Sequence, residues 1–316
     1  MRRALIRRLV VSIPLLLSVS LLTFVLLALT PGNAARTILG TSATPQQLDA
    51  LEKQLGLDEP LYEQYWHWFS GVLHGNLGSS VFTGQPVAQI LSPGLVITLT
   101  LIIAAAAGAL LVGVPLGILS ARRSGPVRHV VDIFSLAGFA IPSFWLGLLL
   151  VVVFALKLHW LPASGWVNPS VSLGSWARSL VLPVVTLSAA GAALIAKQTR
   201  DAMLDVMGQD YIRALRARGL PQRSIVYKHA LRNALPNVVT LLGLYVVSLL
   251  LGTTLVENVF ALQGLGSIAV AATNQHDLPV LEGAALYFTV IVVITFTIVD
   301  LARVWLSPKL RSRHGS

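Results

Sequence analysis

The seven histidines are the side chains best suited to acid–base or metal chemistry, and their spacing supports neither. No pair has the H-E-x-x-H spacing of zinc metalloproteases, and no G-x-S-x-G turn is present to expose a nucleophilic serine. The sequence contains no cysteine, which excludes disulfides, thiolate zinc sites and a cysteine nucleophile. We therefore expect no catalysis by this chain. The histidines are His67, His74, His129, His159, His229, His276 and His314.

ATP binding through a P-loop is also excluded. The Walker A motif requires Gly-Lys followed by Ser or Thr, and no lysine of this sequence precedes Ser or Thr. We expect the chain to bind no cofactor and no metal.

Charged residues at the middle of a membrane mark proton relays and ion-coupled sites. Here the charges near apolar stretches, such as Glu257 and Glu282, fall at the predicted ends of those stretches. Any energy for active transport is therefore expected to enter from outside the chain. The polar residues within the stretches are hydroxyls and amides, which either bond their own helix backbone or together line a polar path. The candidate pore-lining residues are Ser143, Thr186, Ser188, Tyr245 and Ser248.

The elements that carry these residues are strongly apolar. Of the 316 residues, 55% are hydrophobic and only 11% are charged, against about 25% charged in soluble proteins. A membrane span needs about 20 mostly apolar residues. Six such stretches predict an all-α integral membrane fold with six transmembrane helices. They are Leu9 to Leu29, Leu95 to Leu119, Val131 to Leu156, Leu180 to Ala196, Val238 to Val256 and Gly283 to Val299.

The basic residues set the predicted orientation. With both termini in the cytosol, 19 of the 23 lysines and arginines face inward, and only Arg36, Lys53, Lys157 and Arg178 face outward. This asymmetry follows the positive-inside rule, and it explains the net charge of +10 without a nucleic-acid partner. The first apolar stretch is too long for a typical signal peptide, so we interpret it as an uncleaved helix.

The segment 31–94 is predicted to lie outside the membrane as short helices. Thr44 with Pro45 and Gln47 matches a helix N-cap and capping box, and Gly56 is a plausible helix end. An aromatic stripe follows, which is either a belt at the membrane interface or a lid or docking surface for a binding protein. Its residues are Tyr62, Tyr65, Trp66, Trp68 and Phe69.

The longest predicted cytosolic segment, 200–235, reads as two helices joined at Gly219, where glycine permits a positive φ. A second helix is expected from about Gln222. Two small residues three apart provide a face for close approach by another protein, beside apolar anchor residues that include Leu215. The alternative is a basic loop lying on anionic lipid. The candidate residues are Asp210, Tyr211, Ile212, Arg213, Ala214, Ala217, Gly219, Leu220 and Ile225.

This loop resembles the EAA loop of ABC importer permeases in its peptide-permease variant, with Arg213 at the usual glutamate position. Other motifs agree in order along nearly the whole chain, although Asn76 stands where Asp is frequent. The sequence is therefore similar to B-type permeases of the dipeptide/oligopeptide/nickel family. The motifs are Leu57-Asp-Glu-Pro-Leu, Gly75-Asn-Leu-Gly-Ser, Ala140-Ile-Pro-Ser-Phe-Trp-Leu-Gly, Leu161-Pro-Ala-Ser-Gly, Gln209-Asp-Tyr-Ile-Arg-Ala-Leu, Lys228-His-Ala-Leu-Arg-Asn-Ala-Leu-Pro236 and Glu257-Asn-Val-Phe.

The resemblance implies a type I ABC importer permease in the bacterial inner membrane, with both termini cytosolic. The implied partners are a C-type permease, two ATPase subunits that bind ATP and Mg, an extracytoplasmic solute-binding protein and membrane lipid. The implied substrates are di- and oligopeptides, with nickel chelates and glutathione as alternatives. A different class, a self-sufficient secondary transporter or channel, would need an ion site that the sequence does not show.

The resemblance and the apolar pattern together divide the chain into four parts. We expect a first helix in 1–30, an extracytoplasmic region in 31–94, a permease core in 95–306 that contains the loop 200–235, and a cytosolic tail in 307–316.

Overall fold

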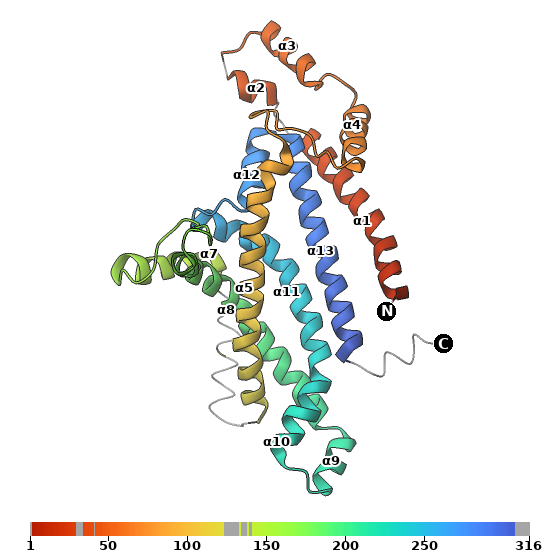
Figure 1. Ribbon diagram of the computed structural model, residues 1–316, viewed down its shortest axis with the longest axis vertical. Helices are drawn as coiled ribbons and strands as arrows, with labels where there is room; N and C mark the ends of the chain where they lie inside the picture. Colours follow the sequence, from red (N-terminus) through yellow and green to blue (C-terminus); the bar gives the residue numbers. More distant parts are fainter. Residues whose placement is uncertain are drawn as a thin grey trace. The chain divides into compact units, whose positions relative to one another are not determined.

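A computed structural model describes residues 2–29, 34–40, 42–122, 133, 138 and 141–306, with side chains from residue 10 onward. The regular secondary structure of the described residues is helical, apart from one isolated bridge between Ser79 and Pro86 (Figure 1). Five helices are long and apolar enough to cross a membrane, and Ser143–Lys157 is a shorter apolar helix. The elements are α1 (Arg2–Leu29), α2 (Ala34–Leu39), α3 (Pro45–Leu55), α4 (Leu61–Leu73), α5 (Val87–Arg122), α7 (Ser143–Leu150), η1 (Val151–Lys157), α8 (Leu173–Met207), α9 (Asp210–Ala217), α10 (Gln222–Ser224), η2 (Ile225–Ala230), α11 (Leu231–Val259), α12 (Leu265–Gln275) and α13 (Leu278–Leu306).

Five of the six predicted spans lie within these long helices, namely α1, α5, α8, α11 and α13. The third, Val131 to Leu156, is described only in part: α7 and the π-helical η1 cover it from Ser143 onward, and its first half lies largely outside the described residues. The four-part division of the chain stays a prediction, and the tail 307–316 also lies outside the described residues.

The chain forms two compact units. The first consists of Met1–Arg3, Thr100–Leu262 and Ile294–Ser316, and the second of Ala4–Leu99 and Gln263–Val293. Helices α5 and α13 each contribute one part to each unit.

In the first unit, α8 and α11 form the most extensive helix pair among the described elements. Tyr245 of α11 lies against Gly191 of α8, where a Cβ would overlap the tyrosine ring. The Tyr245 hydroxyl donates a hydrogen bond of 2.6 Å to the Leu187 carbonyl. Glycine at 191 therefore permits the ring to reach the α8 backbone.

The C-terminal part of α5 also packs on α8. A Cβ at Gly113 would lie 2.7 Å from the Ala192 carbonyl oxygen, and one at Gly117 would lie 2.6 Å from the Ala196 carbonyl oxygen. The spacing of these glycines is that of a G-x-x-x-G contact, in which the lack of side chains allows two helices to approach closely.

In the second unit, α3 begins as the sequence predicts. The Thr44 hydroxyl accepts a hydrogen bond from the Gln47 amide, and the Gln47 side chain accepts one from the Thr44 amide. Gly56 ends the helix with φ of 68°. Asp49, 3.0 Å from the Lys53 ammonium, raises the pKa of Lys53, although an exposed pair of this kind contributes little stability.

The N-terminal part of α5 packs on α12 and α13 within the second unit. Thr98 accepts a hydrogen bond from the Leu265 amide at 2.9 Å, and a Cβ at Gly94 would lie 2.6 Å from Ile268. The Ser80 hydroxyl donates to the Asp277 carboxylate at 2.5 Å. These bonds fix the loop before α5 to the junction of α12 and α13.

Candidate coupling site

Helix α9 lies with α10 at one end of α8 and α11 (Figure 1). Helix α8 ends at Gly208, and α9 starts at Asp210. After Arg218, Gly219 has φ of 77°, and the chain re-enters a helix at Gln222. The predicted Gly219 turn and the start of the second helix are therefore confirmed. The additional break at Gly208 is a feature that the sequence interpretation missed, although a glycine marks it.

A buried apolar core holds this turn to the long helices. Ile212 of α9 and Ile225 of η2 have no exposed surface. Both pack in one cluster with residues from the ends of α5, α8 and α11, and Leu215 and Leu220 border it. The buried members are Ile118, Ala121, Ala202, Met203, Val206, Ile212, Ile225, Val226, Ala230 and Ala234. Ile212 and Ile225 therefore anchor the turn to its own chain rather than presenting an apolar surface to another protein.

The opposite face of α9 is exposed and basic. Ala214 and Ala217 are exposed, as the prediction of a small accessible face requires. The Arg213 guanidinium lies 3.2 Å from the Asp210 carboxylate, and both side chains are largely exposed. Three further exposed arginines lie near this face. The sequence interpretation used them only to predict topology and did not assign them to the site. They are Arg216, Arg218 and Arg223.

Tyr211 joins α9 to α11 directly. Its hydroxyl accepts a hydrogen bond of 2.8 Å from the Asn233 side-chain amide, which also donates to the His229 carbonyl at 3.0 Å. The η2 segment between them is π-helical, a form that recurs at functional sites. From Gln222 to Val259 the chain is continuously helical. A displacement of α9 would therefore act on α11 through the apolar core, through Tyr211 and along the helix itself.

Four of the five candidate pore residues form hydrogen bonds within the first unit. Thr186, Ser188 and Ser248 donate to carbonyls of their own helices, those of Leu182, Val185 and Tyr245. Tyr245 instead bonds the neighbouring helix α8, as described above. Ser143 is the first residue of α7 and is half-buried. Pore lining by these residues stays a prediction.

The aromatic stripe of α4 divides into an anchored and an exposed part. Tyr65 packs on Phe24 of α1 with ring centroids 5.4 Å apart, stacks on Phe69 at 5.9 Å and exchanges a hydrogen bond of 2.8 Å with Ser20. Trp68 also contacts Tyr65. Tyr62 and Trp66 are 72% and 63% exposed, so these two residues form the solvent-exposed surface of the stripe.

Two acidic residues that the sequence interpretation set aside as span-end charges are wholly buried. Glu257 lies in the last turn of α11 and Glu282 in the second turn of α13, and neither has exposed surface. Helix α13 begins at Leu278 rather than at Gly283, so Glu282 lies inside the helix. Within the described part of the chain, no three His, Asp or Glu side chains form a group that could hold a metal.

Long apolar helices with a basic helical turn fixed to two of them are the arrangement expected of a permease of the ABC importer class. Family comparison supports this class. Residues 113–312 match the model described as binding-protein-dependent transport system inner membrane component, and residues 1–102 match the model of its N-terminal part. The chain belongs to this family.

Named relatives agree over nearly full length. The chain is 38% identical over 308 residues to the glutathione transport system permease protein GsiC of Escherichia coli O6:H1, which covers 97% of this chain and 98% of the relative. It is 36% identical over 326 residues to the dipeptide transport system permease protein DppB of Alkalihalophilus pseudofirmus, with 96% and 98% covered. The resemblance to B-type permeases is confirmed.

The fold is similar to that of a solved importer. An inward-facing structure of the MetNI methionine ABC transporter matches with a TM-score of 0.54 and 20% identity, covering 69% of this chain and 97% of that chain. The protein is thus a multi-pass, non-catalytic permease subunit of an ABC importer in the bacterial inner membrane. As a binding-protein-dependent component, it acts with ATPase and binding-protein partners.

Proposed function

We propose that this chain forms half of the translocation pathway of an ATP-driven importer for di- and oligopeptides. The observation that carries the proposal is the coupling site: an exposed basic helix, α9, whose buried side anchors on the ends of α8 and α11. The peptide substrate rests on the relatives, since GsiC is named for glutathione, a small peptide, and DppB for dipeptides.

The proposed assembly pairs this chain with a C-type permease across the pathway and places two ATPase subunits in the cytosol. The chain spans the membrane six times, with the third span running through Val131 to Leu156 and both termini cytosolic. This orientation places α9 and the turn at Gly219 beside the ATPases. It places α2, α3 and α4 on the side of the solute-binding protein.

The proposed coupling uses the two faces of α9 differently. ATP and Mg bind on the ATPases, and closure of these subunits pushes the exposed face around Arg213, Ala214 and Ala217. The buried Ile212 and Ile225 transmit the displacement to α8 and α11, because close-packed cores move as units rather than deforming continuously. Arginine at position 213 implies that the ATPase surface presents carboxylates or carbonyl oxygens to α9.

The proposal also assigns residues to the solute pathway and to the extracytoplasmic surface. Ser143, Thr186, Ser188, Tyr245 and Ser248 line the solute path once the helices rotate and expose their hydroxyls. On the outside, Tyr62 and Trp66 of α4 present an aromatic surface, while Tyr65, Trp68 and Phe69 hold α4 on α1. This surface serves as a docking site or lid for the binding protein, or as an interfacial belt.

The substrate is tested by competition. The complete transporter in proteoliposomes, with its binding protein, is expected to take up a labelled dipeptide when ATP is supplied. Unlabelled di- and tripeptides should compete, whereas free amino acids and nickel chelates should not. Competition by nickel chelates alone, with no peptide effect, would contradict the assignment of peptides.

A further inference from the structure

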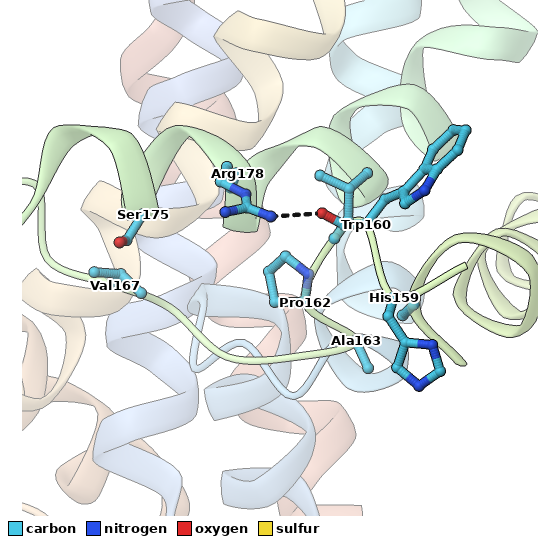
Figure 2. Close-up of a pocket in the computed structure, with 9 residues that line it drawn as sticks. His159, Trp160, Pro162, Ala163, Val167, Ser175 and Arg178 are labelled. Atoms are coloured by element: carbon cyan, nitrogen blue, oxygen red, sulfur yellow. Dashed lines mark hydrogen bonds between the residues drawn. The ribbon is translucent and has the colours of Figure 1, made fainter. Parts of the chain in front are cut away.

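A pocket of about 510 Å³ lies between the end of η1 and the first turns of α8, within the first unit (Figure 2). The coupling and pore residues named above do not line it. In the proposed topology it opens on the extracytoplasmic side, because it follows the third span and precedes the fourth. Its lining residues are Ala155, His159, Trp160, Leu161, Pro162, Ala163, Val167, Ser175 and Arg178.

The pocket wall is held in place by three hydrogen bonds. The Trp160 amide donates to the Phe154 carbonyl of η1 at 2.9 Å, and the Gly165 amide donates to the Phe260 carbonyl at 2.9 Å. The Arg178 guanidinium donates to the Trp160 carbonyl at 2.7 Å, as Figure 2 shows. A wall fixed in this way loses little conformational entropy when a ligand binds.

One residue of the wall adopts a costly backbone conformation. His159 has φ of 55°, a left-handed value that residues other than glycine seldom adopt. Strained residues of this kind persist where the surrounding structure holds them, often at functional sites. The strain turns the chain at the end of η1 so that Trp160 lies at the rim, with its side chain 60% exposed.

Among the described residues that line the pocket, the charged one is Arg178. Arg178 is exposed, and its bond to Trp160 uses one of the five N–H donors of a guanidinium; among the described residues the side chain makes no other hydrogen bond. The segment 157–178 contains Lys157, His159 and Arg178 and no acidic residue. The other long outer segment, 31–94, carries five acids against two basic residues. An anionic partner is therefore favoured at this pocket.

We propose that this pocket receives a carboxylate side chain from an acidic surface loop of the docked solute-binding protein. The inference rests on the proposed function, which brings that protein to this side. Arginine and tryptophan are the residue types most enriched among those that dominate protein–protein affinity. A guanidinium at the wall supplies paired donors for a carboxylate, and the exposed Trp160 offers an aromatic surface beside it.

The test measures the dissociation constant of the purified binding protein on the complete transporter in lipid nanodiscs. Arg178→Glu is expected to weaken docking about tenfold or more, because it removes an attraction and adds a repulsion. Arg178→Gln, which keeps a donor for the Trp160 carbonyl, should weaken docking less, and Trp160→Ala should also weaken it.

Arg36→Glu, an exposed charge reversal on α2, is the control and should change the dissociation constant by less than about threefold. Size-exclusion profiles check that each variant still assembles.

A compensating charge reversal in the binding protein identifies the carboxylate that contacts Arg178. Reversing single acidic residues of the binding protein to arginine should reveal one that restores docking to the Arg178→Glu transporter. Unchanged docking by Arg178→Glu overturns the inference. Unchanged docking with a raised KM for the peptide would mean that the pocket binds a substrate carboxylate. Loss of the partner permease from the complex would mean that the pocket lies at the interface between permeases. Both outcomes also overturn the inference. The dissociation constants test the proposed role of the pocket, and peptide uptake tests the proposed function. Each proposal can therefore fail without the other.

Discussion

Gly219 is the residue on which the shape of the coupling site depends. Its φ of 77° lies in the region that glycine enters without cost and a β-branched residue resists. A Cβ at this position would meet no atom within 4 Å, so a substitution changes the backbone preference without a steric clash. The effect of such a substitution therefore reports on the turn alone.

The first prediction concerns this turn. Gly219→Ala should lower the number of peptides imported per ATP hydrolysed, and Gly219→Val should lower it further, because the turn and the orientation of α9 change. Insertion into the membrane should remain normal. The measurement is ATP hydrolysis and uptake by the same proteoliposomes.

The matched control for this turn is Gly208→Ala. Gly208 has φ of −79°, and its added Cβ would make only ordinary contacts at 3.6 Å, so coupling should be preserved. Equal coupling in the Gly219 and Gly208 variants would contradict the role given to the turn.

The second prediction concerns the contact between Tyr245 and Gly191. Gly191→Ala should destabilise the protein by about 1–3 kcal/mol, the usual cost of overpacking, because its Cβ overlaps the tyrosine ring. Tyr245→Phe keeps the ring and loses only the bond to Leu187, for a cost of about 1 kcal/mol or less. Thermal unfolding in detergent measures both. A Gly191→Ala protein as stable as the wild type would show that the ring does not occupy this position.

At the scale of elements, α8 is the helix on which the first unit is built. It packs on α5 through Gly113 and Gly117, on α11 through Gly191, and on α9 and η2 through the buried core at its C-terminal end. Small residues where helices meet permit close approach where lipid provides no hydrophobic drive. The C-terminal end of α8 therefore determines where the coupling helix lies.

The third prediction compares two glycines within helices. Gly117→Ala on α5 should destabilise the protein, because its Cβ would lie 2.6 Å from both the Ala196 carbonyl oxygen and the Thr199 Cβ. Gly174→Ala on α8 meets no atom within 4 Å and should be neutral or stabilising by up to about 1 kcal/mol, since alanine is the better helix former. Gly117→Ala should lower the midpoint of thermal unfolding, whereas Gly174→Ala should leave it unchanged or raise it. Shifts of the same sign and size would contradict the α5–α8 contact.

The fourth prediction concerns the buried anchor. Ile212→Ala should loosen α9 by removing apolar contacts worth about 2–5 kcal/mol and leave the arginines of the turn open to trypsin. Peptide mapping after limited proteolysis should show faster cleavage between Arg213 and Arg223. Leu204→Ala, at a position 43% exposed on α8, is the control and should cleave at the wild-type rate. Equal cleavage of both variants would mean that Ile212 does not hold α9.

The sequence predicted the elements well because their signals are local. Five spans, the Thr44 cap and the turn at Gly219 depend on runs of apolar residues and on single glycine or threonine positions. The orientation of side chains at the coupling site was not predictable in this way. Ile212 and Ile225 are far from Ile118 in the sequence, and only the packing of the helices shows that they share one core. The burial of Glu282 depends on helix packing in the same way. The pocket at Arg178 is instead formed within one segment, 155–178, and the sequence does not predict the path of that loop.

At the scale of the whole molecule, the proposed orientation gives the chain a binding-protein side and an ATPase side, and its sequence contains no Walker A motif. In the proposed orientation, 19 basic residues and the coupling site face the cytosol, and eight of these residues lie between Lys197 and Arg232. Energy is therefore expected to enter through α9 from a partner rather than from an ion gradient.

The measurement that tests this account most directly is the energy source of uptake. Proteoliposomes should contain this chain with its partner permease, its ATPases and its binding protein. We predict accumulation of labelled dipeptide that requires ATP inside with the ATPases, survives ionophores that dissipate ion gradients, and falls in the Gly219→Val variant while ATP hydrolysis continues. Uptake that persists without the ATPases and collapses with the ion gradient would contradict the account.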